Sequence, residues 1–86
     1  MVLPDMPIPR QYDHPARIPV IEQVLSDIEI RNRCGLFAGG CAFYIDEGNK
    51  RKCLIILPAG SRRYVAWYRR HEVAHCNGWP ADHPRK

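Results

Sequence analysis

Residues 71–75 read His-Glu-Val-Ala-His, and this string places the tightest constraint on how the chain folds. On a helix, two histidines four residues apart lie on one face, one turn from each other. On such a helix the imidazoles of His71 and His75 can bind a single zinc ion. Glu72, adjacent to the first histidine, can then reach a water on the metal and act as general base. The sequence therefore predicts a helix that carries a metal site.

A third ligand is expected outside this helix, because catalytic zinc usually has three protein ligands and one open position. Gly78 allows the chain to turn sharply after the helix, and we take His83 as the ligand that folds back. Asp82 is open as a ligand, as the partner that orients a ligand histidine, or as a cap in the tail. Cys76 projects about 100° from His75 around the helix, so we expect it in the core or in a disulfide.

The stretch from residue 71 onward resembles the zincin metallopeptidases. His71-Glu72-x-x-His75-x-x-Gly78 is similar to the extended HExxHxxGxxH motif of the metzincin branch. In that motif the glycine makes a turn and a later histidine supplies the third ligand. Ala81 stands at the matching position here, so His83 matches only in a shifted register. The resemblance implies a zinc-dependent hydrolase that cleaves peptide or protein substrates, with an exposed edge strand that holds an extended peptide.

Two other function classes compete with this interpretation. A non-catalytic zinc-binding module would use the same histidines with a fourth protein ligand closing the site. A nucleic-acid-binding module would use basic side chains interleaved with aromatic ones; these are Arg62, Arg63, Tyr64, Trp67, Tyr68, Arg69 and Arg70. The same basic residues are typical of a solvated helix face, and the aromatic residues either wall the cleft or fill the core. The net charge of +4 does not decide among these classes.

The four cysteines allow either disulfides or buried thiols. Cys34, Cys41, Cys53 and Cys76 permit two disulfides in three connectivities, and no pair has the CxxC spacing. No apolar run is long enough for a transmembrane helix, so no membrane partner is expected. No basic region followed by an apolar stretch is visible at the start, so no signal peptide is expected. This leaves a cytoplasmic protein or one exported after processing.

The remaining pattern predicts a small α+β domain over residues 19–86, preceded by an arm. The arm, residues 1–18, is rich in proline and should be irregular; its His14 should be an ordinary surface histidine. Residues 19–32 predict an amphipathic helix, with a core-facing stripe of Val20, Ile21, Val24, Leu25 and Ile28.

A hairpin and a second helix should complete this domain. Residues 41–45 and 53–57 are rich in β-prone side chains and flank a turn at Gly48-Asn49, which predicts a β-hairpin. Residues 62–76 predict the metal-binding helix, with Ser61 as its N-cap, followed by the folded-back tail. The expected architecture is a minimal zincin-like domain of helix, hairpin, helix and tail.

Overall fold

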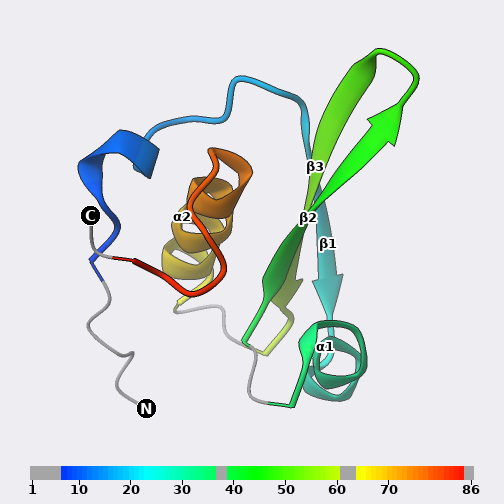
Figure 1. Ribbon diagram of the computed structural model, residues 1–86. Coiled ribbons are helices and arrows are strands. Elements are labelled where there is room, and N and C mark those ends of the chain that lie inside the picture. The colour runs from blue at the N-terminus through cyan, green and yellow to red at the C-terminus, as the bar shows by residue number, and fades with distance from the viewer. Residues whose placement is uncertain (1–6, 37–38, 61–63, 85–86) are drawn as a thin grey trace.

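The computed structural model of the chain describes residues 7–36, 39–60 and 64–84. It confirms a small α+β domain, in which a three-stranded sheet of order β1-β3-β2 lies between two helices (Figure 1). In chain order the elements are a 3-10 turn η1 (Arg10–Tyr12), β1 (Val20–Leu25), α1 (Asp27–Cys34), β2 (Cys41–Glu47), β3 (Lys50–Pro58) and α2 (Val65–Cys76). None of the described helices is long and apolar enough to cross a membrane.

The helix expected over residues 19–32 is wrong. Its first half is β1, which pairs in parallel with β3 from Val20–Cys53 to Leu25–Pro58. Only the second half is helical, and Ser26 begins it with a capping box: the Ser26 hydroxyl accepts from the Glu29 N–H while the Glu29 side chain binds back to the Ser26 backbone. The predicted core-facing stripe is also wrong, because its members do not share one buried face: Leu25 is buried whereas Ile28 is 68% exposed.

The expected hairpin is present, and its second strand is the centre of the sheet. β2 and β3 pair antiparallel from Cys41–Ile56 to Glu47–Lys50, and Gly48 makes the turn with a φ of +62°. Since β3 pairs with β1 on its other side, residues 53–56 are paired along both edges. This position explains why Ile55, Ile56 and Leu57 are completely buried.

Two disulfides fasten the helices to the sheet. Cys34–Cys41 joins the end of α1 to the start of β2, and Cys53–Cys76 joins β3 to the end of α2. The second disulfide lies in the core cluster with Ile55 and Leu57, on the sheet face that α2 covers. All four cysteines are therefore oxidised, and no thiol is left to bind metal.

The described part of the N-terminal arm lies on the domain. Ala16 and Ile18 pack against the core cluster under α2. The side-chain amide of Asn77 donates hydrogen bonds to the carbonyls of Tyr12 (2.9 Å) and His14 (2.7 Å). These contacts hold the arm against the carboxyl end of α2, as the blue and orange segments of Figure 1 illustrate.

Candidate metal centre

The end of α2 turns the chain back on itself in a Schellman motif. The Gly78 N–H donates to the His75 carbonyl (3.0 Å) and the Trp79 N–H donates to the Ala74 carbonyl (3.1 Å). Gly78 has a φ of +99°, a conformation that side chains resist. The predicted left-handed turn at Gly78 is therefore present, and it sends the tail back along the helix (Figure 1).

The tail brings a third histidine against the two on the helix. The Nε2 atoms of His71, His75 and His83 converge, with separations of 3.1 Å (His71–His83), 3.1 Å (His75–His83) and 3.3 Å (His71–His75). His83 has a φ of +56°, and its N–H donates to the Pro80 carbonyl at 2.9 Å. Among the described residues these three form a group able to hold a metal ion.

The spacing of the three nitrogens suits a tetrahedral metal ion. Zinc–nitrogen bonds of about 2.0–2.1 Å at tetrahedral angles place ligand nitrogens roughly 3.3–3.4 Å apart, close to the observed triangle. The His75 Nδ1 lies 2.8 Å from the Trp79 carbonyl. Since a carbonyl only accepts, neutral His75 carries its proton on Nδ1 and presents a lone pair on Nε2 toward the other histidines. The donor set therefore fits zinc.

Burial favours the neutral form, which a metal requires, for two of these imidazoles. His71 is 8% exposed, and burial, reinforced by the charges of His75 and His83, lowers its pKa to about 4. Burial also lowers the pKa of His83, and Asp82 opposes this shift. The His71 Nδ1 is buried and has no hydrogen-bond partner among the described residues.

Glu72 lies on the sheet side of α2, next to the first ligand. It is 4% exposed, and burial raises its pKa to about 7. Its carboxylate sits against Gly40, where an added Cβ would lie 3.3 Å from Oε2 and 2.5 Å from the Ile56 carbonyl oxygen. The lack of a side chain at Gly40 therefore permits its close approach to the Ile56 carbonyl and the Glu72 carboxylate. A carboxyl group whose pKa lies near 7 is suited to exchanging protons.

The other candidate residues lie outside the cluster of nitrogens. Asp82 is exposed and acts on His83 through its charge. Cys76 forms a disulfide with Cys53, which agrees with the prediction that it lies in the core or in a disulfide. His14 lies in the arm, where its ring contacts the Pro15 carbonyl.

The helix arginines that are described form ion pairs. Arg69 pairs with Glu22 of β1 and Arg70 with Asp13 of the arm. These pairs favour a solvated, structural helix face over a nucleic-acid surface. Arg62, Arg63 and the expected cap Ser61 lie outside the described residues.

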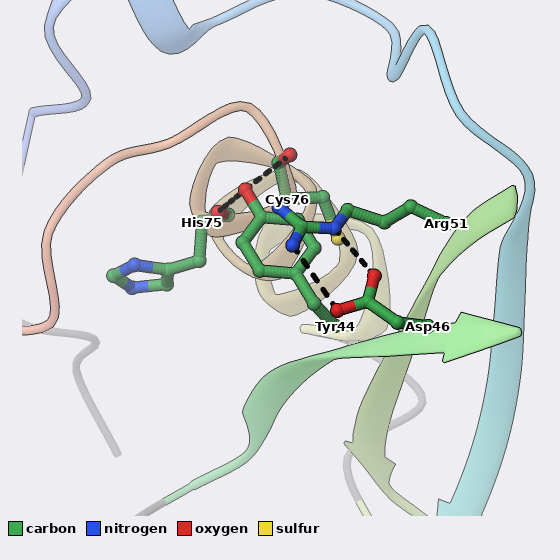
Figure 2. Close-up of polar contacts among 5 residues, drawn as sticks. All are labelled: Tyr44, Asp46, Arg51, His75 and Cys76. Atoms are coloured by element: carbon green, nitrogen blue, oxygen red, sulfur yellow. Dashed lines mark hydrogen bonds and ion pairs between the residues drawn. The ribbon is translucent and has the colours of Figure 1, made fainter. Parts of the chain in front are cut away.

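An edge strand runs beside this helix. Figure 2 shows Tyr44 of β2 reaching α2, where its hydroxyl donates to the carbonyls of Cys76 (2.9 Å) and His75 (3.4 Å), while the His75 ring points away from it. The Arg51 guanidinium lies 4.6 Å from the Tyr44 ring centre and binds Asp46. No described strand pairs with the other side of β2. The resemblance predicts one exposed edge strand; of the two described hairpin strands β2 has the unpaired edge, because β3 is paired on both sides.

Sequence reasoning missed two residues of this centre. Trp79 is 2% exposed and contacts all three histidines; its place directly after Gly78, where a Schellman motif packs a side chain back on the helix, was the available signal. Gly40 is the second, and no local pattern in the sequence links it to Glu72.

Comparison of the chain with protein-family models, with curated proteins and with solved structures found no match. The zincin resemblance therefore rests on the sequence motif alone.

Proposed function

We propose that this protein is a zinc-dependent hydrolase that cleaves peptide bonds. The observation that carries the proposal is the three converging imidazole nitrogens, together with a buried carboxyl group of pKa about 7 on the residue after His71. In the described residues no fourth His, Cys, Asp or Glu joins the three. A three-ligand set with an open position is typical of catalytic rather than structural zinc.

His71, His75 and His83 would hold the ion. When bound, zinc polarises a substrate carbonyl and lowers the pKa of a water molecule. Glu72 would accept the proton of the attacking water and deliver it to the leaving amine nitrogen. Its raised pKa supports this role, because a carboxyl group that titrates near neutral pH both takes up and releases a proton readily.

The substrate would be an extended peptide lying along β2. The free edge of this strand offers backbone groups for strand addition, and its Phe43 is 43% exposed. The Tyr44 hydroxyl fixes the strand to the carboxyl end of α2, which keeps the edge in a constant position relative to the ligand-bearing helix.

The two disulfides favour an oxidising environment as the place of action. Disulfides persist in extracellular and periplasmic proteins and are rare in reducing cytosol, and both pairs here join separate elements of the fold. We therefore infer that, of the two compartments left open, export is favoured.

The test uses the purified, zinc-loaded protein and a broad library of quenched fluorescent peptides. Glu72→Gln should retain zinc, as measured by elemental analysis, and lose cleavage by about 10²–10⁴-fold, the scale of general-base removal. Asp27→Asn is the matched control, since Asp27 is an exposed carboxylate in the first turn of α1, away from both α2 and the β2 edge. Full activity of Glu72→Gln would contradict the proposed role. Zinc binding without cleavage of any peptide by the unsubstituted protein would favour the non-catalytic module.

A further inference from the structure

Trp79 contacts every histidine of the centre. Its ring centre lies 5.1 Å from that of His71, 4.9 Å from that of His75 and 5.0 Å from that of His83. It stacks nearly parallel on His75 (15°) and meets the other two rings at steep angles (66° and 81°). The indole is buried, with an exposed fraction of 2%, and packs against all three histidine rings.

The polar groups of Trp79 act on both segments that supply ligands. Its backbone carbonyl accepts from the His75 Nδ1 at 2.8 Å, which fixes the tautomer and the ring orientation of a ligand on the helix. Its indole Nε1–H donates to the Pro84 carbonyl at 2.8 Å, which anchors the tail one residue beyond His83. One residue therefore orients a ligand on α2 and holds the segment that carries the third ligand.

The turn before Trp79 explains how it reaches this place. In the Schellman motif the Trp79 N–H binds the Ala74 carbonyl one turn back in α2. Ala74, completely buried, offers a small side chain at this point of the helix. The backbone hydrogen bonds of this turn thus bring residue 79 back against α2, where its indole packs on the histidines.

Trp67 provides a natural comparison within the same centre. It stacks on His71 with ring centres 5.0 Å apart and an angle of 20°, and its other described ring contact is with Tyr68. Trp67 is partly exposed and precedes His71 by one helical turn. Both tryptophans therefore stack on a ligand, but only Trp79 joins the helix to the tail.

We propose that Trp79 is the positioning residue of this centre: it holds the three imidazoles in their ligating arrangement and so determines how tightly, and in what geometry, the metal is bound. The proposal rests on the proposed zinc site, because it concerns the three ligands of that site. Its physical basis is preorganisation: ligands already oriented by packing and hydrogen bonds lose less freedom when the ion arrives.

The decisive experiment compares Trp79→Phe with Trp67→Phe in the full chain with both disulfides intact. Zinc affinity is measured by competition with a chromophoric chelator, and the coordination geometry is read from the visible absorption spectrum of the Co²⁺-loaded protein. The Trp79→Phe substitution keeps an aromatic ring that can stack on His75 and removes the hydrogen bond from Nε1–H to the Pro84 carbonyl. We expect Trp79→Phe to lose about 10–100-fold in affinity, the scale for groups that orient ligands, with a changed Co²⁺ spectrum. Trp67→Phe should change affinity less than about threefold and leave the spectrum unchanged.

Equal zinc affinities and identical Co²⁺ spectra for the two variants would overturn the proposal. A purely structural role for Trp79 would lower the urea midpoint of the metal-free protein without changing the Co²⁺ spectrum, and that outcome would also overturn it. Failure of the unsubstituted protein to bind zinc would refute the proposed function itself, whereas zinc binding that is insensitive to Trp79→Phe would refute only the inference about Trp79.

Discussion

Replacing Glu72 with glutamine should stabilise the metal-free protein, and by an amount that depends on pH. The pKa of Glu72 rises from 4.5 in the unfolded chain to about 7 in the folded protein because the carboxyl group is buried. Between these values the folded state binds more protons than the unfolded state, so the stability of the wild type falls as pH rises. Gln is neutral at every pH and has no such loss.

The magnitude follows from the two pKa values. The loss of folding free energy that Glu72 causes is about 0.8 kcal/mol at pH 5 and about 3.4 kcal/mol at pH 8. The stability advantage of Glu72→Gln should therefore grow by about 2.5 kcal/mol over this range. For a chain of 86 residues, with a urea m-value of about 1 kcal/mol/M, the gap between the two unfolding midpoints should widen by about 2.5 M.

The assay is urea unfolding of both proteins in chelator, without reductant, at several pH values from 5 to 8. The pH dependence of the other groups, His71 included, is shared by both proteins and cancels in their difference. Glu47→Gln serves as control, since removing an exposed ion pair changes stability by less than about 1 kcal/mol. A constant difference between wild type and Glu72→Gln from pH 5 to 8 would refute the argument that Glu72 is buried with a raised pKa.

Three further predictions concern the metal, the fit of β2 and the disulfides. Because the pKa of His71 is about 4, this histidine should take up almost no proton between pH 5 and 6, so the logarithm of the zinc affinity should fall with a slope below three per pH unit as the pH is lowered; a slope of three would contradict this. Gly40→Ala should cost about 1–3 kcal/mol in urea unfolding, since its Cβ would lie 2.5 Å from the Ile56 carbonyl oxygen; an unchanged midpoint would refute the close approach. Replacing the Cys53–Cys76 disulfide with two alanines should cost about 3.4 kcal/mol from its separation of 23 residues, against about 2.4 kcal/mol for the Cys34–Cys41 disulfide with its separation of 7; thermal or urea unfolding can measure both.

The ligand set could be proposed from the sequence because its geometry is local. The spacing of His71 and His75 needs only a helix to bring the rings together, and Gly78 needs only its left-handed turn to return the tail. The direct contacts of Trp79 and Gly40 could not be predicted in the same way. The place of Trp79 after Gly78 indicates that its side chain packs back on the helix but not which rings it contacts, and Gly40, just before β2, meets Glu72 only through tertiary packing.

The helix predicted over residues 19–32 is wrong in its first half because the strand that pairs with this segment is distant in sequence. The apolar positions of residues 20–28 fit a helix, and β1 forms because β3, more than 25 residues later, offers a buried parallel partner. A local signal for the true boundary was present in Ser26 and Glu29, whose spacing is that of a capping box. The Ser26–Glu29 spacing therefore marks the position at which the strand ends and the helix begins.

The closeness of the three ligands in sequence has a consequence for the order of folding. His71, His75 and His83 span thirteen residues, so closing this loop around an ion costs little chain entropy. The parallel pairing of β1 with β3 must instead bring together segments that begin at Val20 and Cys53, and such non-local contacts form slowly. We therefore expect the helix and tail to capture metal early, so that the sheet assembles against a centre that already exists.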